Sequence, residues 1–128
     1  MPKILLVEDN EMNRDMLSRR LVRKGYDVVM AVDGGEGVAQ AKSVVPDLIL
    51  MDVSLPVMDG LEATRQIRAK EAAGSGSRVP ILALTANARK EDIAECLAAG
   101  MDGHLSKPFD RQDLDEAIAK LMAAAPAA

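Results

Sequence analysis

Hydrophobic and polar residues follow two alternating patterns along the chain. Short apolar runs rich in Val, Ile and Leu predict β-strands over residues 3–8, 27–31, 47–52, 80–84 and 103–106. Apolar residues at helical spacing predict helices over residues 12–24, 33–44, 61–70, 89–99 and 110–122. Five strand–helix pairs in succession predict an α/β fold with a parallel sheet.

The ends of these elements carry their own signals. Asp33, followed by Glu36, is typical of a helix-capping box, and Gly25 and Gly100 are expected to end helices. The apolar run at residues 48–51 does not alternate, which indicates a central strand buried on both faces. We expect one domain over residues 1–123, followed by a short Ala/Pro tail over residues 124–128.

Composition narrows the classes of function. The 128 residues are 48% hydrophobic but include no Trp, one Tyr and one Phe, so stacking on bases is disfavoured. A net charge of -4 and a pI near 5.0 offer no general attraction for nucleic acid or anionic membranes. The single Cys96 excludes an internal disulfide, and neither a leader nor a long apolar run occurs. We therefore expect a cytoplasmic protein.

Four predicted strands end in residues that suit phosphoryl chemistry: Glu8 and Asp9, Asp52, Thr85, and Lys107. The carboxyl ends of strands in such a sheet face one crevice, so these side chains should gather there. A hard cation relieves the repulsion between the acids, and Mg²⁺ is the best candidate. Asp52 is the candidate nucleophile, since a carboxylate can take a phosphoryl group. Lys107 and Thr85 would contact phosphoryl oxygens.

Each of these residues also has an ordinary interpretation. Glu8 and Asp9 suit a solvated turn that caps a helix, and Asp52 suits a polar strand end. Lys107 suits a surface salt bridge and Thr85 a β-branched strand position. The functional interpretation depends on four matching strand ends in one chain.

Four segments together resemble the response-regulator receiver domain of two-component signalling. They read VEDN at residues 7–10, LMDVSLPVMDG at residues 50–60, LTA at residues 84–86 and SKPF at residues 106–109. The match spans nearly the whole chain in the family's order. The resemblance implies a flavodoxin-like doubly wound fold, with a five-stranded parallel sheet of order 2-1-3-4-5 flanked by five helices; a receiver protein is itself a standard example of this order.

The resemblance also implies roles for single residues. Asp52 would accept a phosphoryl group from a histidine kinase or histidine phosphotransfer protein. Asp9 and Asp52 would bind Mg²⁺ directly, Glu8 would bind it through water, and the backbone carbonyl of Ser54 would complete the protein ligands. Such a domain is a phosphorylation-activated switch that binds a downstream protein target or relays phosphate, and it is not an enzyme with a separate substrate.

Three further positions concern switching and the lifetime of the phosphoryl group. Ser54 and Asn87 resemble the pair that tunes dephosphorylation in receivers. His104, three residues before Lys107, stands where the family usually has Tyr or Phe. Our hypothesis is that His104 changes rotamer on phosphorylation and can charge near neutral pH; the alternative is an inert strand-end residue.

Other functions remain open from the residues alone. A Mg²⁺-dependent aspartyl-phosphate phosphatase of the haloacid dehalogenase type would need an acid where Ser54 stands. A flavin or nucleotide module lacks its glycine-rich fingerprint here. A receiver that works without phosphate is a third alternative. The chain is either a stand-alone regulator or a receiver excised from a hybrid histidine kinase.

Overall fold

The structure is a computed structural model, which describes residues 2–53, 55, 58–74, 78–85, 89–107 and 110–124. Two of the predicted tuning residues, Ser54 and Asn87, lie outside these ranges. Residues 125–128 of the predicted tail do so as well.

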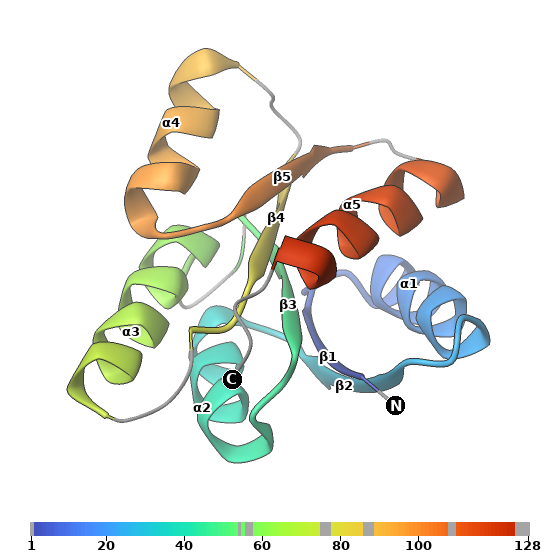
Figure 1. Cartoon of the computed structure of the whole chain (residues 1–128), viewed down its shortest axis with the longest axis horizontal. Helices are drawn as coiled ribbons and strands as arrows, with labels where there is room; N and C mark the ends of the chain where they lie inside the picture. Colours follow the sequence, from blue (N-terminus) through green and yellow to red (C-terminus); the bar gives the residue numbers. More distant parts are fainter. Residues whose placement is uncertain are drawn as a thin grey trace.

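Five strands alternate with five helices (Figure 1). The strands are β1 (Lys3–Val7), β2 (Asp27–Ala31), β3 (Leu48–Asp52), β4 (Ile81–Thr85) and β5 (Gly103–Ser106). The helices are α1 (Glu11–Arg23), α2 (Gly34–Val44), α3 (Gly60–Ala73), α4 (Lys90–Ala99) and α5 (Arg111–Ala124). All strand pairs are parallel and the sheet order is β2-β1-β3-β4-β5, which confirms the predicted fold and places β3 at the centre.

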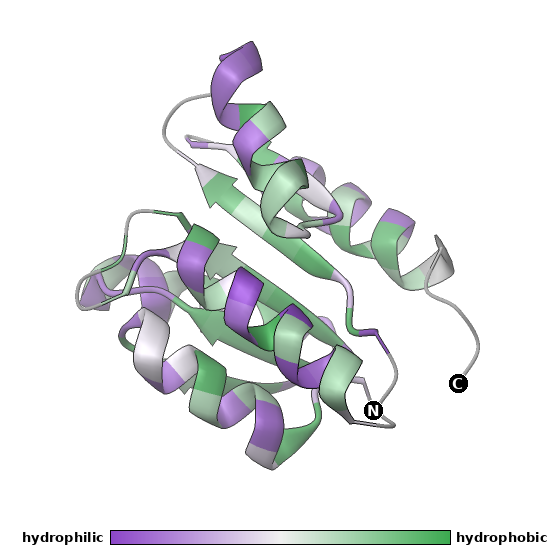
Figure 2. Ribbon diagram, turned by 90° about the vertical axis from the view of Figure 1, so that its left-hand side faces the viewer, coloured by the Kyte–Doolittle hydropathy of each residue, from purple (hydrophilic) through white to green (hydrophobic). Residues whose placement is uncertain are grey.

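Residue parity decides which face of the sheet each core side chain covers, because successive strand residues point to opposite faces. Even-numbered apolar residues of β1, β3 and β4 pack with Leu17 and Leu21 of α1 and with Leu114 and Ile118 of α5. The odd-numbered ones form the second cluster, with α2, α3 and α4 (Figures 1 and 2). Each fully buried Leu or Ile contributes about 1.5–3 kcal/mol.

Four helices begin with a side-chain cap. The Oδ1 atoms of Asn10, Asp33, Asp59 and Asp110 each accept a hydrogen bond from the backbone N–H three residues later, at 2.8–2.9 Å. Such a bond satisfies one of the free N–H groups at a helix start. Arg89, the N-cap of α4, makes no side-chain cap bond.

Helix α3 extends beyond its predicted end. It continues from the predicted Lys70 to Ala73 and ends at Gly74. The added residues Glu71, Ala72 and Ala73 are all strong helix formers, so the helix continues until the glycine. No helix in the described ranges combines the length and apolarity needed to cross a bilayer.

Candidate functional site

The strand register brings Glu8 and Asp52 side by side. Val7 of β1 is level with Met51 of β3, so the next residues along the two neighbouring strands are Glu8 and Asp52. Both numbers are even, and the two side chains leave the sheet on the same side. Glu8 is fully buried and Asp52 is 4% exposed. Two carboxylates are thus held together away from water.

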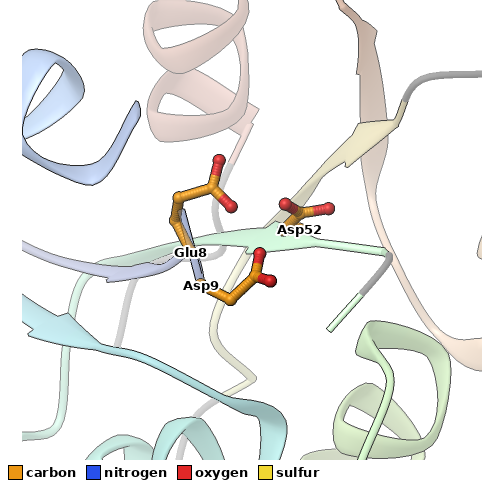
Figure 3. A group of neighbouring side chains, drawn as sticks. All are labelled: Glu8, Asp9 and Asp52. Atoms are coloured by element: carbon orange, nitrogen blue, oxygen red, sulfur yellow. The ribbon is translucent and has the colours of Figure 1, made fainter. Parts of the chain in front are cut away.

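Asp9 completes a group of three acids. One carboxylate oxygen from each of Glu8, Asp9 and Asp52 lies within 4.8 Å of the others. Figure 3 shows the three side chains turned toward one another at the ends of β1 and β3. Asp9 is exposed, so the group is open to solvent on that side. Oxygen ligands gathered in this way suit a hard divalent cation.

Lys107 reaches this group from the end of β5. Its Nζ donates to Asp52 Oδ2 at 3.0 Å and to Glu8 Oε1 at 3.3 Å. Thr85 ends β4, one residue past the position level with Asp52, and its carbonyl accepts from the Lys107 N–H at 2.7 Å. Thr85 is 6% exposed. The strand ends therefore meet as predicted, while the chemical roles of their residues stay predictions.

The electrostatics of the group are unbalanced, because three carboxylates face one ammonium. Burial, together with the hydrogen bond to Asp52 and its charge, raises the pKa of Glu8 to about 7, although Lys107 acts in the opposite direction. For Lys107, burial lowers the pKa, but hydrogen bonding to Asp52 and the charges of Asp52 and Glu8 outweigh it and raise the pKa above its ordinary value. Lys107 therefore stays charged at neutral pH.

One carboxylate oxygen of Glu8 receives no hydrogen bond from the described residues. Glu8 Oε2 is buried and accepts no hydrogen bond within the described part of the chain. A buried acceptor without a donor is costly, and a ligand or its water commonly satisfies such an atom. The orphaned oxygen of Glu8 and the carboxylates of Asp9 and Asp52 form an oxygen-rich group that could hold a divalent cation such as Mg²⁺.

Arg14 also belongs to the site, although it is not among the residues that the sequence analysis predicts for it. Its Nη1 donates to the carbonyl of Glu8 at 2.9 Å and to that of Asp9 at 3.3 Å. The guanidinium of α1 therefore holds the backbone of both acids. The only signal in the sequence is an arginine placed one turn into the helix after the acids, which is too common to be diagnostic.

The remaining predicted residues lie elsewhere or outside the described ranges. His104 is exposed on β5, and no described contact tests its proposed rotamer change. Ser54 and Asn87 lie outside the described residues. The structure thus brings together the acids, Thr85 and Lys107, and leaves the switching and tuning residues as predictions.

Comparison with known proteins agrees with this arrangement. The chain belongs to the response regulator receiver domain family, which matches residues 4–119. It is thus a receiver domain of two-component signalling. It is 46% identical over 114 residues to hybrid signal transduction histidine kinase G of Dictyostelium discoideum, an alignment that covers 88% of this chain and 3% of that kinase. The chain spans 3–15% of the length of five curated histidine kinases that it matches.

Two solved structures are informative. The receiver domain of sensor histidine kinase PA1611 from Pseudomonas aeruginosa PAO1 has a magnesium ion coordinated in its active site cleft; it is 45% identical, with a TM-score of 0.86, covering 96% of this chain and 98% of that one. A chain from the co-crystal of the Saccharomyces cerevisiae histidine phosphotransfer protein Ypd1 with the receiver domain of Ssk1 is 33% identical, with a TM-score of 0.89, covering 95% of this chain and 90% of that one.

Proposed function

We propose that this receiver domain is a phosphorylation-activated switch in which Asp52 is the phosphoacceptor. The observation that carries the proposal is the contact between Asp52 Oδ2 and Lys107 Nζ at 3.0 Å, in the middle of three convergent acids. A nucleophile, a cation for the transferred oxygens and ligands for a metal ion are the parts that phosphoryl transfer needs. The chain turns over no separate substrate.

In the proposed reaction, a carboxylate oxygen of Asp52 attacks the phosphorus of a phosphohistidine. The bond from phosphorus to the histidine nitrogen breaks as the bond to the Asp52 oxygen forms, and the electron pair leaves with the imidazole. Lys107 turns its ammonium from the Asp52 carboxylate to the phosphoryl oxygens, and the Thr85 hydroxyl donates to one of them. A bound Mg²⁺ would add positive charge beside these oxygens and relieve the repulsion among Glu8, Asp9 and Asp52.

The proposed phosphodonor is a histidine kinase or a histidine phosphotransfer protein. Ypd1, which binds the receiver domain of Ssk1, supports the second possibility. Beside the acids, Met12 is 81% exposed and Met16 is 44% exposed on α1. Flexible apolar side chains of this kind suit the docking of a helix from the donor. The phosphorylated domain would then bind a downstream protein or relay the phosphoryl group, without contact to nucleic acid or membrane, in the cytoplasm.

The similarity to hybrid histidine kinases supports a relay within a longer protein as the alternative setting. A Mg²⁺-dependent phosphatase is less well supported, because Ser54 stands where that class needs its second acid. Steady release of phosphate from a small ester would favour the phosphatase. Labelling that stops at one phosphoryl group per chain would favour the switch.

The test is incubation with acetyl phosphate and Mg²⁺ followed by intact-mass measurement. We expect one added phosphoryl group in the wild type and none in Asp52→Ala. Asp47→Ala is the matched control, since Asp47 precedes the other end of β3 and its carboxylate accepts a hydrogen bond from the Lys3 N–H. Labelling that survives in Asp52→Ala, or that does not need Mg²⁺, would contradict the proposal.

A further inference from the structure

Two glycines on consecutive helices make unusually close backbone contacts beside the site. Gly34 is the first residue of α2 and Gly60 is the first residue of α3. A Cβ atom on Gly34 would overlap the carbonyl oxygen of Met58 and lie 2.7 Å from its carbonyl carbon. A Cβ atom on Gly60 would overlap the carbonyl oxygen of Asp52 and lie 2.9 Å from the Cα of Val53. A Cβ atom could be accommodated at such distances only if the neighbouring backbone shifted.

The reason for glycine at these positions is space and not backbone freedom. Among the described glycines, only Gly25 and Gly100 have a positive φ. Gly34 and Gly60 have no positive φ and each is the first residue of a helix, so the backbone conformation does not by itself require glycine there. What the two positions require is the absence of a side chain, because another backbone lies directly against them.

The contacts form a continuous path to Asp52. The start of α2 lies against the backbone of Met58, two residues before Gly60. Gly60 lies in turn against the backbone of Asp52, and its N–H donates to the carbonyl of Val53 at 3.0 Å. The path consists of backbone atoms and has no flexible side chain that could absorb a shift.

Hydrogen bonds hold each part of this path in place. Asp33 and Asp59 cap the two helices that Gly34 and Gly60 begin. The buried hydroxyl of Thr64 donates to the carbonyl of Gly60 at 2.8 Å. On the other side, the Val53 N–H donates to Leu84 of β4 at 3.0 Å, so the end of β3 is clamped between β4 and α3. A displacement of α2 or α3 would therefore shift the backbone of Asp52.

We propose that Gly34 and Gly60 are positioning residues that fix the backbone of Asp52 and, with it, the spacing of the three carboxylates. The proposal rests on the function proposed above. Mg²⁺ demands short and nearly ideal distances to its oxygen ligands, about 2.0–2.1 Å. A shift of Asp52 by a few tenths of an ångström would weaken metal binding although no ligand has changed. Neither glycine touches the reacting atoms.

The experiment compares Gly34→Ala and Gly60→Ala with two control variants. Gly37→Ala changes the same helix one turn later, where the new Cβ would meet the Val7 methyl groups at 3.0 and 3.1 Å instead of backbone. Gly103→Ala places its Cβ in ordinary contact with Leu82, at 3.5 Å. Binding of MgCl₂ alone is followed by the NMR amide shifts of Asp52 and Val53, and folding is followed by circular dichroism.

We expect the Mg²⁺ dissociation constant to rise about tenfold or more in Gly34→Ala and Gly60→Ala, the usual loss when a group that orients a metal ligand is changed. It should stay within about twofold of wild type in Gly37→Ala and Gly103→Ala. The Mg²⁺ concentration for half-maximal labelling by acetyl phosphate should rise in parallel, because the defect lies in metal binding.

Three results would overturn the proposal. The first is a Mg²⁺ affinity in Gly34→Ala and Gly60→Ala within about twofold of wild type. The second is an equal loss in Gly37→Ala. The third is that Gly34→Ala and Gly60→Ala fail to fold while Gly37→Ala folds, since the contacts would then serve packing alone.

A wild-type protein that binds no Mg²⁺ would instead refute the proposed function. In that case the metal-free amide shifts of Asp52 and Val53 still decide the present proposal. They must move in Gly34→Ala and remain in place in Gly103→Ala.

Discussion

Two ionic clusters lie at opposite ends of the same sheet and differ first in their balance of charge. At the carboxyl ends of the strands, Glu8, Asp9 and Asp52 face Lys107. At the amino ends of β4 and β5, two arginines face two acids: Arg68, Arg78, Glu71 and Asp102. The second cluster is balanced in charge and the first has an excess of negative charge.

The balanced cluster is also complete in its hydrogen bonds. Both oxygens of Glu71 accept bonds, from Arg68 and from the Val79 N–H. Both oxygens of Asp102 do so as well, from the two arginines and from the Ile81 N–H. Arg68 also donates to the carbonyls of Gly100 and Val79, at 2.9 and 2.7 Å. This cluster joins α3 to β4 and to the end of α4.

The comparison distinguishes a cluster that stabilises the fold from one that is suited to binding a ligand. Where every acceptor has a donor, a ligand has nothing to add, and the cluster serves stability. Where a buried oxygen such as Glu8 Oε2 has no described donor and like charges crowd together, the fold carries a cost that a cation can remove. Charge balance and hydrogen-bond satisfaction therefore distinguish the two clusters better than the number of charged residues.

The largest stability effect is expected at the balanced cluster. Arg68 is 16% exposed, and Arg68→Ala removes the shared donor of Glu71, Asp102 and two carbonyls. We expect the free energy of unfolding to fall by about 4 kcal/mol, since the acids are left with too few donors. Urea denaturation measures this loss. Mg²⁺ affinity should stay within about twofold, and a large drop in affinity would show that the two clusters are not independent.

The next effect is a pH dependence that belongs to the unbalanced cluster. The folded protein keeps a proton on Glu8 up to a pKa of about 7, whereas an unfolded glutamate releases it near 4.5. Stability without metal should therefore fall as the pH rises from about 4.5 to about 7, by up to about 3 kcal/mol for this group. Urea unfolding in EDTA across this range measures the slope.

Two controls sharpen the pH experiment. Glu8→Gln should flatten the slope, because no proton is exchanged at that position. Saturating Mg²⁺ should also flatten or reverse it, since a bound cation favours ionised carboxylates. A slope that is the same in Glu8→Gln and wild type would assign the pH dependence to other groups.

The smallest effect is expected for removal of one charge at the site. Asp52→Asn relieves repulsion while Lys107 keeps Glu8 as its partner, so we expect the metal-free protein to gain about 1 kcal/mol. The same measurement on Asp102→Asn provides the comparison and should show a loss. A loss of stability in Asp52→Asn would mean that the ion pair with Lys107 outweighs the repulsion among the acids.

The sequence predicted which side chains meet at the ends of the strands, but not the arginines that hold the surrounding backbone in place. Glu8, Asp52, Thr85 and Lys107 could be found because parallel strands bring their carboxyl ends together whatever the details of packing. Arg14 and Arg68 could not, because their roles depend on backbone carbonyls that only the folded chain brings within reach. Arg68 and Asp102, for example, are 34 residues apart.

The glycines show the same limit. Gly34 follows a capping aspartate and Gly60 ends a loop motif, so both suit ordinary turn positions in the sequence. Their close contacts with Met58 and Asp52 depend on how α2 and α3 pack, which local pattern does not specify. The prediction of helix ends has a similar limit. The end of α3 was predicted at Lys70, although good helix formers continue to Ala73.

The two ends of α4 are held very unequally. The carbonyl of Gly100, just past its last turn, accepts bonds from Arg68 and Arg78, whereas Arg89 at its start makes no side-chain cap bond. Side-chain hydrogen bonds to the backbone therefore anchor α4 at its C-terminal end. Amide hydrogen exchange within α4 should accordingly be fastest in its first turn. Any displacement of this helix should be largest at that end and smallest at the end that the two arginines hold.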